Sequence, residues 1–224
     1  MRLSFEFAVL ACVPAVLVAA AVLDMQASAA LTFVVVIGAL ALFFADYERS
    51  KPALRQIMPT VVLAAFAAAG RILFAAIPDF KPVSALCIVA GSVFGRKSGF
   101  MVGALAALVS NFFFGQGPWT PWQMYAWGLV GYLAAVLVEK GAFEKTSMLL
   151  AYGFLSGWLY GLLLNAWYVI GFVHPITWQS VLLAYAAGFP LDTLHGIATV
   201  VFLSALYVPL RRKLQRIKRK FALV

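Results

Sequence analysis

The chain of 224 residues is 64% hydrophobic and only 11% charged, with a formal net charge of +9. Soluble domains average about 45–50% apolar and about 25% charged residues, so this composition excludes an ordinary soluble protein and indicates an integral membrane protein. The only two cysteines, Cys12 and Cys87, both lie inside apolar runs, which excludes a disulfide framework and a cysteine metal site.

Eight apolar runs follow one another, and each is a candidate membrane helix because about 20 apolar residues cross the hydrocarbon layer. They cover residues 5–23, 29–45, 59–77, 82–94, 97–114, 122–138, 148–171 and 179–207. The first run, with Arg2 before it and Ala27-Ser28-Ala29 after it, resembles a signal peptide, but its length favours a retained helix. The run 82–94 is short, and we expect a tilted crossing buried among its neighbours rather than a re-entrant segment.

The basic residues predict the orientation. A basic tail ends the chain: Arg211, Arg212, Lys213, Arg216, Lys218, Arg219 and Lys220. If this tail is cytoplasmic, the eight-span path places all 17 Lys and Arg residues inside except Lys81, in an outer loop, and Arg71, within a helix. We therefore expect an all-α, multi-pass protein of the cell membrane with both termini cytoplasmic. A transmembrane hairpin over 1–50 would precede a six-helix core with its basic tail over 51–224.

On this path, polar residues gather in the outer half of the bundle. They are Arg71, Asn111, Asn165, Tyr168 and Asp192. Polar groups in a bilayer usually face a cavity, so we expect a pocket open to the outside, with a polar floor made of Arg71, Asn111, Asn165 and Asp192. Three alternatives stay open. Arg71 could snorkel to the interface. Asn111 and Asn165 could hydrogen-bond neighbouring helices. Asp192 could neutralise Arg71 or His195.

The stretch Phe114-Gly-Gln-Gly-Pro-Trp-Thr-Pro-Trp-Gln123 separates two of the apolar runs. Its two glycines and two prolines exclude a continuous helix, so we expect a rigid loop. Gln116, Trp119, Trp122 and Gln123 would form a lid that stacks on a ligand and donates hydrogen bonds to it. An interfacial aromatic belt is the alternative, but a belt has no need of the glutamines. Lys81 and His174, in the other outer loops, are further candidate ligand contacts, although His174 could also be a belt residue.

One helix carries pairs of small residues. Ala64/Ala68 and Ala65/Ala69 are pairs at a four-residue spacing, which allows a helix of this chain or of a partner to approach closely.

The sequence has no Gly-x-x-x-x-Gly-Lys-Ser/Thr loop and no metal-binding motif, so we expect no ATP hydrolysis, no cofactor and no catalysis by this chain. His195 and Asp192 could serve a membrane-embedded enzyme, but no nucleophile is evidently paired with them.

Several segments occur in an order that resembles a known family. They are the alanine-rich helix, Ile77-Pro-Asp-Phe-Lys-Pro82, Phe94-Gly-Arg-Lys-Ser-Gly-Phe100, and Ser110-Asn111 leading into Gly115-Gln-Gly-Pro-Trp119. Over about 58–224 the chain resembles the substrate-binding S components of energy-coupling factor (ECF) vitamin transporters. The two helices before residue 50 are additional to that pattern.

The resemblance implies a non-enzymatic subunit that captures a vitamin on the outer face. It implies docking through Ala64 and Ala68 onto a transmembrane T subunit, which is coupled to two cytoplasmic ATPase subunits. Ligand contacts would come from Ile77–Lys81, Gly115–Gln123 and Phe172–Trp178. The loop composition is most like that of cobalamin-type members, whereas an anion such as pantothenate would explain Arg71 and Lys81. A stand-alone facilitator is the remaining alternative. Membrane lipid, and no nucleic acid, is the expected environment.

Overall fold

The computed structural model describes residues 3–22, 28–49 and 54–221, and every regular element in these ranges is a helix. The helices are α1 (Leu3–Val22), α2 (Ser28–Arg49), α3 (Leu54–Leu73), α4 (Val83–Phe94), α5 (Arg96–Phe114), α6 (Trp119–Glu139), α7 (Thr146–Phe172) and α8 (Trp178–Lys220), with a single 3-10 turn at Ala142–Glu144. Each predicted apolar run forms one of these helices, so the all-helical fold is confirmed. Arg2 and Lys51, two of the basic residues used to predict the orientation, lie outside the described residues.

Four helices in the described part of the chain are long and apolar enough to cross a membrane. They are α3, α5, α7 and α8. This finding indicates membrane association, whereas the arrangement of two plus six spans and the side on which each loop lies stay predictions. The apolar stretch of α1 in this part of the chain is shorter, and α4 has only 12 residues. Nearly all of α4 is buried among other helices, as expected for the short run.

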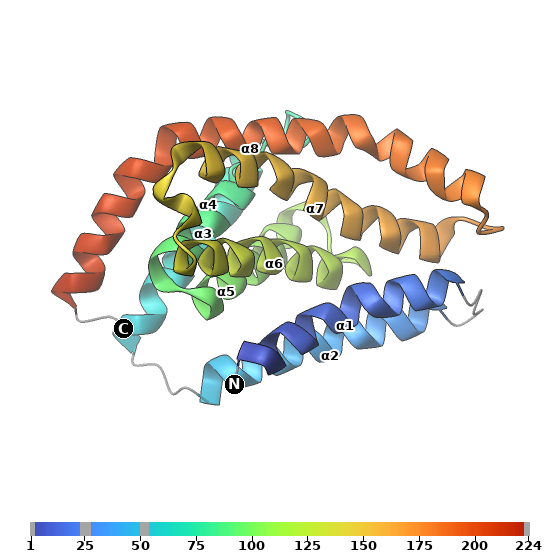
Figure 1. Ribbon diagram of the computed structural model, residues 1–224, viewed down its shortest axis with the longest axis horizontal. Coiled ribbons are helices and arrows are strands. Elements are labelled where there is room, and N and C mark those ends of the chain that lie inside the picture. Colours follow the sequence, from blue (N-terminus) through green and yellow to red (C-terminus); the bar gives the residue numbers. More distant parts are fainter. Residues whose placement is uncertain (1–2, 23–27, 50–53, 222–224) are drawn as a thin grey trace.

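The longest helix is α8, which has 43 residues and therefore spans about 65 Å. It continues past the predicted end at residue 207 and carries the basic tail as helix to Lys220. Figure 1 shows α8 arching across one side of the bundle, with α7 beside it and the hairpin of α1 and α2 on the opposite side. The tail is therefore an extension of the bundle and not a separate arm.

Glycines let the backbones of α4, α5 and α6 approach closely at the centre of the fold. A Cβ atom on Gly131 of α6 would lie 2.2 Å from the carbonyl oxygen of Gly99 on α5. A Cβ atom on Gly91 of α4 would lie 2.1 Å from the carbonyl oxygen of Gly131. No side chain fits at such distances, so these positions determine how the three central helices cross.

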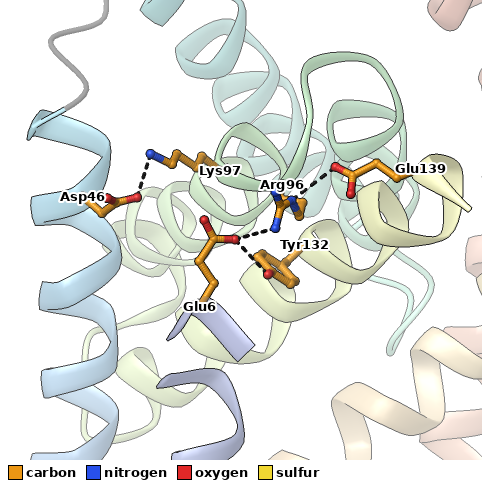
Figure 2. Close-up of polar contacts among 6 residues, drawn as sticks. All are labelled: Glu6, Asp46, Arg96, Lys97, Tyr132 and Glu139. Carbon is orange, nitrogen blue, oxygen red and sulfur yellow. Dashed lines mark hydrogen bonds and ion pairs between the residues drawn. The ribbon is translucent and has the colours of Figure 1, made fainter. Parts of the chain in front are cut away.

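Ion pairs tie the N-terminal hairpin to the central helices (Figure 2). The buried Glu6 carboxylate of α1 accepts hydrogen bonds from Arg96 at 2.8 Å and from the Tyr132 hydroxyl at 2.9 Å. Asp46 of α2 lies 2.7 Å from the Lys97 ammonium, and Arg96 also reaches Glu139 at 3.2 Å. The first turn of α5 therefore anchors both helices of the hairpin.

Replacing Glu6 with glutamine should loosen the hairpin, because a hydrogen bond to a charged group contributes about 1.5–3 kcal/mol. We expect faster hydrogen–deuterium exchange in α1 and at the start of α5, together with a lower unfolding temperature. Glu48→Gln, at the exposed end of α2, is the matched control and should change neither quantity. Unchanged exchange in Glu6→Gln would mean that the Glu6 contacts do not hold α1 in place.

Candidate functional site

A cavity of about 180 Å³ lies among α3, α6, α7 and α8, next to the loop that joins α3 to α4. We call it the polar cavity, because most of the side chains around it carry polar groups. It is lined by Arg71, Ala75, Asp79, Lys81, Phe114, Gln123, Trp127, Tyr160 and His195. Its volume corresponds to about six molecules of liquid water, so it suits a small solute.

The Arg71 guanidinium group is turned into the bundle. It donates hydrogen bonds to Ser110 Oγ at 2.7 Å and to Asn111 Oδ1 at 2.6 Å. Its central carbon lies 4.5 Å from the centroid of the Phe114 ring and 5.0 Å from that of Trp127, within the range of cation–π attraction. The snorkelling alternative is therefore wrong, and the cation is held in one orientation at the cavity wall.

Asn111 lies behind the cavity wall and orients two of the residues that form it. Besides accepting from Arg71, it donates through Nδ2 to Gln123 Oε1 at 2.8 Å and to Thr120 Oγ1 at 3.0 Å. Asn111 is fully buried, so its amide is satisfied by this chain. Of the predicted polar floor, Arg71 lines the cavity and Asn111 supports it.

Lys81 and Asp79 bring opposite charges to the loop between α3 and α4. The Lys81 ammonium donates to the carbonyl oxygens of Phe74, at 2.5 Å, and of Ile77, and so caps the C-terminal end of α3. Burial raises the pKa of the Asp79 carboxyl and lowers the pKa of the Lys81 ammonium, and the charge of each partly offsets this effect on the other. With Arg71 included, two cations and one carboxylate surround the cavity, which favours a bound anion.

His195 is buried and reaches the cavity from α8. Its Nε2 atom lies 2.7 Å from Ser84 Oγ at the start of α4, and its ring centroid lies 4.9 Å from that of Tyr160. Asp192, one turn earlier, instead accepts a hydrogen bond from Asn165 Nδ2 at 2.8 Å. The alternative in which Asp192 neutralises Arg71 or His195 is therefore wrong. Asn165 and Asp192 form a link between α7 and α8, outside the lining of the cavity.

The predicted lid loop is shorter than expected. Helix α6 already begins at Trp119, because proline near the start of a helix has the required φ angle and needs no donor there. Trp122 is consequently fully buried, while Trp119 is 36% exposed and its ring lies against Gly117. Gln116 donates to the Leu108 carbonyl oxygen at 2.9 Å. Only Gln123 of the four predicted lid residues lines the cavity.

Two further predicted contacts lie away from the cavity. Tyr168 is 49% exposed and stacks on Phe172, with ring centroids 5.9 Å apart. His174 is exposed in the loop that joins α7 to α8, which projects beyond the loop between α5 and α6 in Figure 1. Neither residue belongs to the lining, so the structure does not support them as ligand contacts.

The predicted docking surface for a T subunit, Ala64 and Ala68, is not on the outside of the bundle. Ala64 and Ala68 are 3% and 2% exposed, so they are packed inside the bundle and unavailable to a partner. The alternative of internal packing therefore applies to this pair. Ala65 and Ala69, the other small pair of α3, are exposed.

Reasoning from the sequence missed several cavity residues. Trp127 lies one helical turn after Gln123, so extending the polar face of α6 by four residues would have found it. Phe114, at the edge of the predicted loop, has no polar group that would mark it as a cavity residue. Tyr160 lies in the middle of a long apolar run, where no local signal distinguishes it from a packed aromatic residue.

Comparison with known proteins identifies a family but no characterised relative. No curated protein and no solved structure matches the chain. Residues 50–217 match a family whose description is family of unknown function, DUF6580. This region includes every residue that lines the polar cavity and leaves out α1 and α2. Because the match covers about three quarters of the 224 residues, the chain belongs to the DUF6580 family.

Proposed function

We propose that this protein captures a small anionic solute, with a carboxylate as the recognised group, in the polar cavity. The observation that carries the proposal is the Arg71 guanidinium group, fixed at the wall of a cavity inside an apolar bundle. Guanidinium is the side-chain group best suited to binding a carboxylate, because its planar donors match the two oxygens. Lys81 adds a second positive charge, and Gln123 and Tyr160 add polar groups for orientation.

The transport role is the second part of the proposal and rests on the resemblance to ECF S components. The protein would hold its ligand for a transmembrane T subunit driven by two ATPase subunits. In support, the cavity lies wholly within α3 to α8, the six helices expected to form the core. The surface for the T subunit would contain the exposed Ala65 and Ala69 in place of Ala64 and Ala68.

The size of the cavity changes the proposed ligand. Pockets for drug-sized molecules have volumes of about 300–1,000 Å³, and a corrin is larger than such molecules. The polar cavity measures about 180 Å³, which argues against cobalamin. Pantothenate, a single carboxylate on a short polar chain, lies at the upper limit of what this space admits, and smaller carboxylates fit within it.

The direct test is to identify the bound molecule. Small molecules that copurify with the protein in detergent would be identified by mass spectrometry. Binding of pantothenate would then be compared with that of panthenol, which has an alcohol in place of the carboxylate. We expect carboxylates to bind and raise the unfolding temperature, and panthenol to do neither. Equal binding of panthenol would contradict recognition of an anion.

Gln123→Ala should weaken ligand binding by about tenfold, since a hydrogen bond contributes about 1–1.5 kcal/mol. Gln116→Ala is the matched control, because it removes a glutamine amide that lies outside the cavity. We expect this variant to keep wild-type affinity. Trp119→Ala should likewise change the dissociation constant by less than about twofold, because the ring lies outside the lining. Titration calorimetry measures all three. A large loss of affinity in Trp119→Ala would support the predicted role of Trp119 in covering the ligand.

While the ligand carboxylate stays ionised, its binding should strengthen as the pH falls towards the pKa of Asp79, which burial raises above the usual 3.8. Protonation removes the one negative charge at the cavity, while Arg71 and Lys81 keep their positive charges. Asp79→Asn should bind the anion more tightly at neutral pH and abolish this dependence. It should also raise the unfolding temperature at neutral pH, because a carboxyl with a raised folded-state pKa destabilises the fold when ionised. Affinity independent of pH in the unmodified protein would remove Asp79 from the site.

The contact between Ser84 and His195 favours an enzyme as the second candidate. A hydroxyl 2.7 Å from an imidazole is the geometry of an activated nucleophile. Ser84, however, is fully buried and is absent from the lining of the cavity. A fluorophosphonate probe tests this candidate. We expect no labelling, whereas labelling that is lost in Ser84→Ala would establish a serine hydrolase.

A further inference from the structure

A second and larger hollow lies between α3 and the C-terminal half of α8, with the start of α4 as its floor. We call it the α3–α8 groove, and its volume is about 740 Å³. Its walls include Val62 and Phe66 of α3 and Leu206 and Leu210 of α8. Phe66 is 64% exposed, so the groove offers a large unpartnered apolar surface. An apolar surface is ordinary where a helix faces lipid, but a groove of this volume can also hold an apolar chain.

The residues that line the groove change along its length. At one end, the rings of Phe74 and Phe202 lie 5.2 Å apart, and Phe80 packs against Phe202 at 5.3 Å. Because Phe74 lines the groove and Ala75 lines the polar cavity, this aromatic cluster separates the two hollows. Towards the other end, the cations Arg55 and Lys213 join a lining that stays otherwise apolar through Leu214, Ile217 and Phe221.

The cationic end is held in place by the fold. Lys218, about one turn beyond Lys213, donates from Nζ to the carbonyl oxygen of Val93 at 2.9 Å. This bond holds the end of α8, which carries Lys213, against the end of α4. The resulting surface is a long apolar groove with two cations, Arg55 and Lys213, near one end.

We propose that the α3–α8 groove binds an anionic phospholipid. One acyl chain lies along the apolar walls, and the phosphate lies against Arg55 and Lys213. The argument is chemical complementarity. An apolar acyl chain suits the apolar walls of the groove, and a negatively charged headgroup suits the cations Arg55 and Lys213. The two helices that form its walls, α3 and α8, are among the four described helices long and apolar enough to cross a membrane, so we expect the groove to face lipid. Basic residues near the membrane surface attract anionic headgroups.

The test is lipid retention, measured by native mass spectrometry. The purified, delipidated protein is mixed with equal amounts of phosphatidylglycerol and phosphatidylcholine that carry the same acyl chains. We expect phosphatidylglycerol to be retained preferentially. The double variant Arg55→Gln/Lys213→Gln should reduce that preference by about tenfold. Inorganic phosphate should not displace the bound lipid, because phosphate lacks the acyl chain.

Arg212→Gln/Arg219→Gln is the matched control, since it removes two exposed cations of α8 that do not line the groove. This control should keep the preference. An equal loss in both double variants would overturn the proposal, because the basic helix would then attract anionic lipid without the groove. Val62→Trp should lower the retention of both lipids by filling the groove. Unchanged retention in Val62→Trp, or photocrosslinking of a protein segment instead of lipid from position 62, would also overturn it.

Discussion

Arg71→Gln is expected to abolish measurable ligand binding, with a loss of affinity of at least about a hundredfold. Removing one partner of a desolvated, hydrogen-bonded charge pair costs about 2–5 kcal/mol, and each 1.4 kcal/mol is about tenfold. Glutamine retains an amide but neither the charge nor the planar group between Phe114 and Trp127. Titration calorimetry with the identified carboxylate measures the effect.

Two variants separate the role of Arg71 in binding from its role in folding. Arg71→Lys keeps the charge without the paired donors, so we expect intermediate affinity. Asn165→Ala removes a polar side chain from the same bundle, outside the cavity, and should retain wild-type affinity. If Asn165→Ala lost binding while Arg71→Gln kept it, the site would lie between α7 and α8 and the polar cavity would be an incidental packing void.

Gly131→Ala is expected to destabilise the protein by about 3 kcal/mol or more, because the added methyl group would meet the backbone of Gly99 on α5. Its Cβ atom would lie 2.2 Å from the Gly99 carbonyl oxygen, and backbone cannot rotate away as a side chain can. The loss of stability is measured by thermal unfolding in detergent, with intrinsic fluorescence as the signal. Gly99→Ala should behave similarly, since its Cβ atom would lie 2.5 Å from the Gly131 carbonyl oxygen.

Gly171→Ala is the matched control for these variants. It lies in α7, where an added Cβ atom would meet nothing within 4 Å. Because alanine favours a helix over glycine by up to about 1 kcal/mol, this variant should be neutral or slightly more stable. Equal destabilisation by Gly171→Ala and Gly131→Ala would mean that the close crossing of α5 and α6 contributes little.

Ligand affinity and the stability of the fold both depend on the crossing of α5 and α6. A Cβ atom on Gly103 would lie 2.3 Å from backbone atoms of Trp127, whose side chain lines the polar cavity. The same close approach brings Asn111 of α5 within hydrogen-bonding distance of Gln123 of α6. Widening the crossing should therefore weaken ligand binding as well as stability.

The sequence by itself determined the class of the protein and most of its helices. Apolar runs of membrane length must form helices, because a bilayer offers no other partner for backbone amides. The cost of burying charge also identified Arg71 correctly as a residue facing the interior. Lys81 and Gln123, predicted as contacts from an outer loop and from the lid loop, both line the polar cavity.

Only the tertiary structure decided which polar residues meet. Spacing along one helix gives the face that a residue occupies, but not which neighbouring helix that face contacts. Asp192 pairs with Asn165 instead of His195, and Ala64 and Ala68 turn inward while Ala65 and Ala69 face outward. The rotation of each helix is set by the sum of its long-range contacts, above all the glycine crossings of α4, α5 and α6, and no local pattern encodes that sum.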